Sequence, residues 1–153
     1  MGLIGVGEEL GWRGWLLPTL ASERRFAAAA ALTGLAWTLW HLPVFFSGVA
    51  LALSYLCLLI SLSILQAWLW VRTQGSIGVA ALAHGSVNAP FFFTEAVLRK
   101  HTNGAAITAT AFAFQAALYS ALAIVAVASS RDIWLQRTSA SVIRTFTKRG
   151  ISQ

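Results

Sequence analysis

The distribution of charged positions divides the chain into long apolar stretches. Three stretches contain no Asp, Glu, Lys or Arg, namely residues 26–71, 73–94 and 102–130. One helix over the first stretch would extend about 69 Å, whereas the hydrocarbon core of a bilayer is about 30 Å thick. We therefore expect this stretch to reverse direction once, at Ser47 and Gly48, which follow Pro43 and favour a turn.

This pattern predicts an all-α fold, a polytopic transmembrane helix bundle, because an open sheet cannot satisfy its backbone polar groups in lipid. The predicted spanning helices are four in number and cover roughly residues 26–46, 51–71, 77–97 and 105–128. The segment before Pro18 is shorter and charged, and predicts a partial or re-entrant helix from Gly2 to Leu17. Residues 1–130 then form a membrane-embedded core, and residues 131–153 form a basic tail.

Composition excludes two classes of protein. Hydrophobic residues make up 58% and charged residues 10% of the 153 positions, and the mean hydropathy is +0.70. A soluble domain carries about 25% charged residues, and a disordered chain has low hydrophobicity. The single cysteine, Cys57, excludes an internal disulfide and any site with several cysteine ligands.

The net charge of +6 marks one side of a membrane rather than a nucleic-acid partner. Four spans would place eight basic residues on one side, from 21–25, 72–76 and the tail, and only Arg99 and Lys100 on the other. The positive-inside rule makes the first side, with the C-terminal tail, cytoplasmic. We expect a multi-pass protein of a bacterial plasma membrane, surrounded by membrane lipid, with a solvated tail rather than one that lies on an anionic membrane surface.

Polar residues inside the apolar segments are candidates for function, because ionisable groups are costly in a bilayer. Measured from the predicted cytoplasmic ends, Glu8 lies about 21 Å deep, His41 about 24 Å, His84 about 18 Å and Asn88 about 24 Å. Three separate segments thus bring polar groups to a similar depth. The sequence predicts one buried polar site between helices.

The densest cluster is Glu8-Glu9-Leu10-Gly11-Trp12-Arg13. Glu9 and Arg13 are four positions apart on one helix face and are expected to pair. Glu8 points about 100° away around the helix, is left without a local partner, and is suited to act as a general base. The alternative is an ordinary charged helix end at the surface.

Two histidines complete the predicted site. Trp37 and His41 are four positions apart and share a helix face, and the same holds for His84 and Asn88. Both His84 and Asn88 are able to donate hydrogen bonds to an oxyanion. The alternatives are a hydrogen-bonded core histidine and polar contacts that join helices. Three other tryptophans are interpreted as anchors at the membrane interface: Trp12, Trp15 and Trp134.

The order of three motifs, E-E-x-x-x-R, aromatic-x-x-x-H and H-x-x-x-N, resembles that of the CPBP intramembrane endopeptidases, also called the Abi or type II CAAX prenyl protease family. Three segments contain the motifs: Glu8–Arg13, Trp37–His41 and His84–Asn88. The flanking Gly14-Trp15-Leu16-Leu17-Pro18 and His41-Leu42-Pro43 add to the likeness, which covers roughly residues 5 to 95.

The resemblance implies a role for each motif residue. Glu8 and His41 would activate water, His84 and Asn88 would stabilise the oxyanion, and Glu9 and Arg13 would support them. No cofactor is favoured. The alternative is zinc held by Glu8, His41 and His84, although an H-E-x-x-H pair is absent from the sequence.

The chain departs from the family pattern at two places. Trp37 stands where phenylalanine is usual, which keeps an aromatic ring and should be tolerated. Family members have further spanning helices before the first motif, whereas seven residues precede Glu8 here. The chain therefore resembles the C-terminal core of such a protein, and a second chain is an expected partner that would supply the missing helices.

The sequence thus predicts an intramembrane endopeptidase that hydrolyses a peptide bond in a membrane-associated, prenylated or leader peptide. One alternative is a non-catalytic membrane protein of the same family, with a role in bacteriocin immunity or as a scaffold. A small transporter that relays protons through the same residues is a third reading, and the lack of an inverted repeat counts against it.

Overall fold

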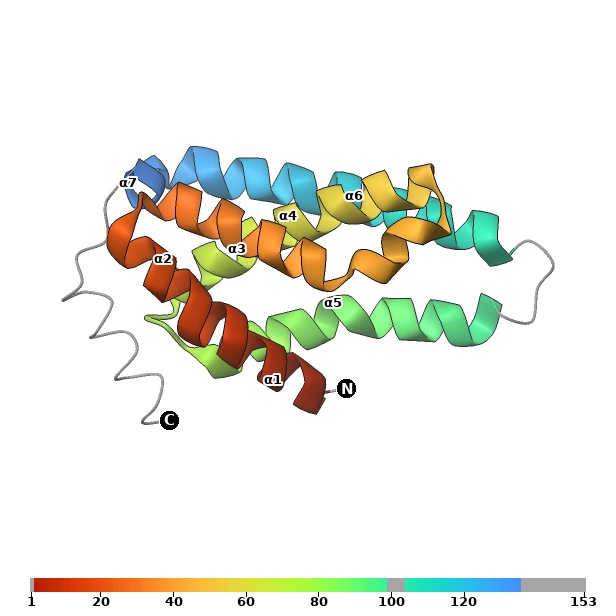
Figure 1. Ribbon diagram of the computed structural model, residues 1–153, viewed down its shortest axis with the longest axis horizontal. Helices are drawn as coiled ribbons and strands as arrows, with labels where there is room; N and C mark the ends of the chain where they lie inside the picture. Colours follow the sequence, from red (N-terminus) through yellow and green to blue (C-terminus); the bar gives the residue numbers. More distant parts are fainter. Residues whose placement is uncertain (1, 99–103, 136–153) are drawn as a thin grey trace.

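The computed structural model describes residues 2–98 and 104–135, and within these ranges every regular element is a helix. Side chains are described for residues 5–46, 48–89 and 108–135. The helices lie roughly side by side in a bundle, and the N-terminal helices cross one face of it (Figure 1). The predicted all-α class is confirmed.

The N-terminal segment is helical from Gly2 to Glu23 and does not stop at Leu17 as predicted. It consists of α1 (Gly2–Gly11), a π-helical turn η1 (Trp12–Leu16) and α2 (Leu17–Glu23). Pro18 lies in the first turn of α2, and the preceding N–H of Leu17 reaches the carbonyl of Trp12. Proline has no N–H and its ring crowds the preceding turn, and a wider π turn accommodates both defects without ending the helix.

The first predicted span is shorter than expected. Helix α3 (Phe26–Trp40) begins at the predicted residue, but its α-helical part ends after 15 residues, or about 22 Å. A 3-10 helix η2 (Leu42–Ser47) follows, with Pro43 at its start. Gly48 then reverses the chain at a φ of +124°, which glycine adopts without strain, so the predicted turn is confirmed.

Helix α4 (Val49–Arg72) packs closely against α3 through small residues. A Cβ atom built on Gly34 would lie 2.9 Å from Cβ of Ser63, too close for a side chain there. Ser63 Oγ also donates to the carbonyl of Ala30 at 3.0 Å. Small residues let membrane helices approach in this way and replace the missing hydrophobic driving force by close contact.

Two further long helices complete the bundle, α5 (Ile77–Leu98) and α6 (Gly104–Ser129). Helix α6 lies along α4, and α1 crosses the N-terminal half of α5 (Figure 1). Ser61 Oγ and Ser120 Oγ join α4 to α6 at 2.8 Å. The α1–α5 crossing is close at Gly5, where a Cβ would lie 3.3 Å from the carbonyl oxygen of Ala81.

The bundle is that of a membrane protein. Two of the described helical segments, Val49–Arg72 and Thr108–Ser129, are long and apolar enough to cross a membrane, and two shorter apolar helices cover Phe26–Trp40 and Ile77–Ala89. Many large apolar side chains face outward, among them Phe46, which is 84% exposed. Burial of so few of these side chains against protein is consistent with lipid around the helices.

The start of the predicted tail is packed against the bundle, which corrects the expectation of a solvated segment from residue 131. Arg131–Leu135 form a short helix, α7, in which Trp134 is 3% exposed. Its ring centroid lies 5.4 Å from that of Phe26, and its Nε1 donates to Ser130 Oγ at 3.1 Å. Trp134 is therefore a core residue and not an interface anchor. Residues 136–153 of the predicted tail lie outside the described residues.

Candidate active site

Glu9 and Arg13 form a buried ion pair on the inner face of the N-terminal helices. Arg13 Nη1 donates to Glu9 Oε1 at 2.9 Å, and both side chains are fully buried. The pairing predicted from their spacing is confirmed. Among the described residues, Arg13 Nε and Nη2 and Glu9 Oε2 find no further hydrogen-bond partner, so this pair depends strongly on its one short contact.

His84 joins this pair from α5. Its Nδ1 lies 2.8 Å from Glu9 Oε1, the oxygen that also accepts from Arg13. An ionised carboxylate only accepts hydrogen bonds, so His84 Nδ1 carries a proton and donates it to this contact. The ring is 3% exposed and is held in one orientation, with Nε2 directed to the side of Glu8, 4.0 Å from Glu8 Oε2.

Glu8 points from the N-terminal helix toward α3, and its side chain is 21% exposed. Trp37 Nε1 donates to Glu8 Oε2 at 2.9 Å, and Trp12 Nε1 reaches the same oxygen at 3.4 Å. The expectation that Glu8 lacks a local partner is therefore wrong, because Trp12 lies one helical turn further along the same face. Trp12 is half-buried at this site rather than an interface anchor, whereas Trp15 is 66% exposed.

His41 occupies the C-cap of α3, where the helix gives way to η2. Its Nδ1 lies 2.9 Å from the carbonyl oxygen of Trp37. The carbonyl can only accept, so Nδ1 is protonated, and the neutral ring then presents Nε2 as a lone pair. The predicted packing of Trp37 and His41 on one face is confirmed, with ring centroids 6.2 Å apart in an edge-on arrangement.

The indole of Trp37 contacts Glu8, Arg13, His41 and His84. Besides its hydrogen bond to Glu8, its ring lies 4.8 Å from the guanidinium carbon of Arg13 and 5.0 Å from the ring of His84. A guanidinium over an aromatic face is attracted by the ring quadrupole. Trp37 thus holds the side chains of α1, α3 and α5 in a fixed relation.

One cavity of about 70 Å³ brings the predicted catalytic residues together. Its polar lining contains the four of them, Glu8, His41, His84 and Asn88. The convergence that their depths predicted is therefore present in the fold. The supporting residues Glu9 and Arg13 do not line the cavity and lie behind His84 and Trp37.

Helices α4 and α6 supply the opposite wall of the cavity, and two polar residues there were missed by the sequence reasoning. Tyr55 lies with its ring 5.5 Å from that of His41, and Gln115 lines the cavity from α6. The remaining lining is apolar: Leu58, Leu59, Leu62, Val87 and Phe112, with the ring of Trp37. Both Tyr55 and Gln115 are polar residues within charge-free stretches, which is the signal that would have found them.

The alternative zinc set consists of Glu8, His41 and His84. Among the side chains that the structure describes, in residues 5–46, 48–89 and 108–135, no three His, Cys, Asp or Glu groups lie together so as to hold a metal ion. His84 Nδ1 and His41 Nδ1 are already engaged, by Glu9 and by the Trp37 carbonyl respectively.

Comparisons with known proteins found a matching family and a similar curated protein. The model of a family described as "Type II CAAX prenyl endopeptidase Rce1-like" matches residues 1–90, which contain all the polar residues of the predicted site. A curated relative, "CAAX prenyl protease 2" of Methanococcus maripaludis, is 28% identical over 97 residues, which covers 56% of this chain. The chain spans only 36% of the length of that relative. No solved structure matches the chain.

Proposed function

Because the chain belongs to the type II CAAX prenyl endopeptidase Rce1-like family, we propose that it is an intramembrane endopeptidase that acts with glutamate-activated water. Its substrate is a membrane-associated peptide, either prenylated or a leader peptide. The observation that supports this most directly is the shared cavity of Glu8, His41, His84 and Asn88.

Glu8 and His41 serve as the base for the attacking water. Two indole N–H groups hold Glu8 Oε2, while Oε1 receives no hydrogen bond from a described residue and is left for water. His41 accepts a proton from the same water at Nε2, because its Nδ1 already carries a proton that is donated to the Trp37 carbonyl. Water between the two groups loses a proton as its oxygen attacks the scissile carbonyl carbon.

His84 and Asn88 stabilise the oxyanion of the tetrahedral intermediate. The Nδ1 proton of His84 is committed to Glu9, so donation to an oxyanion comes from Nε2 of a protonated ring. In that state the formal charges of Glu8, Glu9, Arg13 and His84 sum to zero. When the intermediate collapses, the proton taken from water passes to the leaving amine and the peptide bond breaks.

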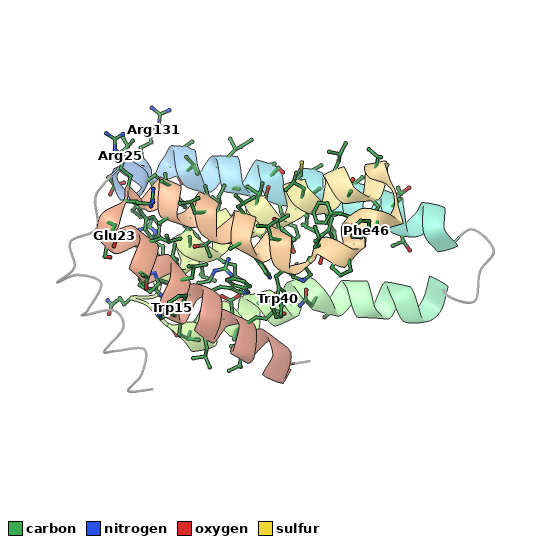
Figure 2. The ribbon with its side chains drawn as sticks, in the orientation of Figure 1. Trp15, Glu23, Arg25, Trp40, Phe46 and Arg131 are labelled. Carbon is green, nitrogen blue, oxygen red and sulfur yellow. The ribbon has the colours of Figure 1, made fainter. Side chains whose placement is uncertain are left out.

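The proposed placement in the membrane has four spans, with the basic ends of the helices on the cytoplasmic side. Arg25 and Arg131 lie at one end of the bundle, and Phe46 lies well away from them, toward the other end (Figure 2). This separation supports an orientation by the positive-inside rule. In this placement, lipid is a partner of most of the outer surface. A second chain that supplies further helices is the other proposed partner.

The test is cleavage by the full chain in liposomes of an internally quenched, farnesylated peptide that ends in Cys-Val-Ile-Met, a prenylation signal. Glu8→Gln and His41→Ala should each lower kcat by about 10²- to 10⁴-fold, the usual contribution of general acid–base catalysis. His84→Ala and Asn88→Ala should cost about 10²- to 10³-fold. Glu23→Gln, at an exposed carboxylate, is the matched control and should leave cleavage unchanged. Unchanged cleavage in both Glu8→Gln and His41→Ala protein that inserts normally would refute the proposal.

A further inference from the structure

Gln115 on α6 is a polar residue of the cavity that neither the motifs nor the family match accounts for. The motifs and the matched residues 1–90 place the catalytic side chains on α1, α3 and α5. Gln115 lies beyond this match, on the wall that faces them, next to the apolar side chain of Phe112. Its role therefore has to be inferred from its own surroundings.

The amide of Gln115 forms no hydrogen bond with any described residue, although the side chain is half-buried. An amide has two donors and an acceptor, and those of Gln115 are open to a partner in the cavity because no described residue pairs with them. The other residues of α6 are uncharged and largely Ala, Leu, Val, Ile and Phe, so they offer the Gln115 amide no side-chain partner. The unpaired amide indicates a partner that enters the cavity.

Other polar side chains of the bundle serve the packing of helices and differ from Gln115 in this respect. Gln66 on α4 is 4% exposed, and its Nε2 donates to the carbonyl of Ala80 on α5 at 3.3 Å. Ser120, also on α6, is joined to Ser61 of α4. Gln66 Nε2 and Ser120 Oγ thus find protein partners, although Gln66 Oε1 has none among the described residues, whereas Gln115 lines the cavity that contains Glu8 and His41.

We propose that Gln115 is a substrate-binding residue whose amide hydrogen-bonds to the backbone of the peptide beside the scissile bond. A peptide unit offers one N–H and one C=O, and a glutamine amide matches both with its own acceptor and donor. The contact holds the peptide across the cavity, opposite the catalytic side chains. The inference rests on the proposed endopeptidase function and adds the residue that positions the substrate.

The experiment compares KM and kcat of the full chain in liposomes, with the farnesylated Cys-Val-Ile-Met peptide, for Gln115→Met and Gln115→Asn. Loss of one neutral hydrogen bond should raise KM about 3- to 10-fold and leave kcat within about 2-fold. Gln66→Met is the matched control, because it makes the same substitution at a glutamine with a structural partner. It should lower thermal stability and leave KM unchanged.

A second series replaces each backbone amide near the scissile bond of the peptide by an ester, one position at a time, which removes one N–H. With the unaltered chain, one position should weaken binding by a factor similar to that of Gln115→Met. In the Gln115→Met protein the same ester should cause no further loss, since the two groups form one contact. An unchanged KM in both Gln115 variants, or ester losses that add to the loss from Gln115→Met, would overturn the inference.

Binding of the same peptides to Glu8→Gln protein separates this inference from the proposed function. Binding that depends on Gln115 without any cleavage by the unaltered chain would refute the endopeptidase and leave the peptide contact standing. Cleavage with binding that is independent of Gln115 would refute the contact alone. Neither binding nor cleavage would refute both.

Discussion

The buried pair of Glu9 and Arg13 predicts a specific pattern of stability losses. Glu9→Leu removes the acceptor for two donors, Arg13 Nη1 at 2.9 Å and His84 Nδ1 at 2.8 Å, and leaves a fully buried guanidinium uncompensated. Removing one partner of a buried ion pair costs about 3–5 kcal/mol. Arg13→Met leaves Glu9 with His84 as its remaining partner and should cost a similar amount.

The double variant Glu9→Leu/Arg13→Met should be less destabilised than the sum of its parts. Neither buried charge remains in it, and the methionine keeps an aliphatic side chain against the ring of Trp37. The remaining defect is the His84 donor, which costs about 1–3 kcal/mol when it is left unpaired. We therefore expect the double variant to lose about 1–3 kcal/mol, where simple addition of the single losses gives about 6–10 kcal/mol.

Reversible unfolding in mixed micelles of a mild detergent and SDS, followed by circular dichroism, measures these free energies of unfolding. The Glu23→Gln variant, at an exposed position, provides the control for loss of a carboxylate and should remain within about 0.5 kcal/mol of the unaltered chain. Single losses of less than about 1 kcal/mol, or a double variant equal to their sum, would refute the account of Glu9 and Arg13 as one coupled, buried pair.

Three further predictions follow from packing and from the donor set. Gly34→Ala should lower the free energy of unfolding by about 1–3 kcal/mol, because its Cβ would lie 2.9 Å from Cβ of Ser63. Gly11→Ala is the control, since a Cβ at Gly11 would have no atom within 4 Å. Equal stabilities of the two variants in the same unfolding assay would contradict the close helix contact. Trp134→Ala should lower the free energy of unfolding by about 3–5 kcal/mol and expose the N-terminal end of α3 to proteolysis. Trp15→Ala should change the free energy of unfolding little, because Trp15 is exposed and Trp134 is buried. Peptide cleavage should persist after dialysis against a zinc chelator, and recovery of lost activity by added zinc alone would contradict the glutamate mechanism.

Much of the candidate site follows from local spacing. The pairing of Glu9 with Arg13 and the shared face of Trp37 and His41 depend only on positions four apart in a helix, and both are present. The prediction that Glu8 has no local partner was wrong, because Trp12 is not only an apolar side chain but also a hydrogen-bond donor. An indole N–H placed one turn away can donate a hydrogen bond to a carboxylate, and composition alone does not reveal which way the indole points.

The helix bounds agree with the prediction at the Gly48 turn and differ from it at Pro18, where a π-helical turn accommodates the proline. The reversal at Gly48 was predicted from turn residues and is present at a positive φ. Pro18 was expected to end the first helix, but the π turn before it lets the helix continue to Glu23. Pro43 had the opposite outcome, because the α-helix had already ended at Trp40 and a 3-10 helix follows.

The sequence by itself indicated a helical membrane protein and predicted that Glu8, His41, His84 and Asn88 converge on one site. Long charge-free stretches are incompatible with other folds in lipid, and an ionisable group in such a stretch is too costly to be incidental. Only the tertiary structure decided how those groups are paired. Contacts such as Trp37 with Glu8, 29 positions apart, and His84 with Glu9, 75 positions apart, depend on which helix faces pack together. The same packing brings Gln115 of α6 to the cavity, because the opposite wall of a site is set by helix crossings that no local pattern encodes.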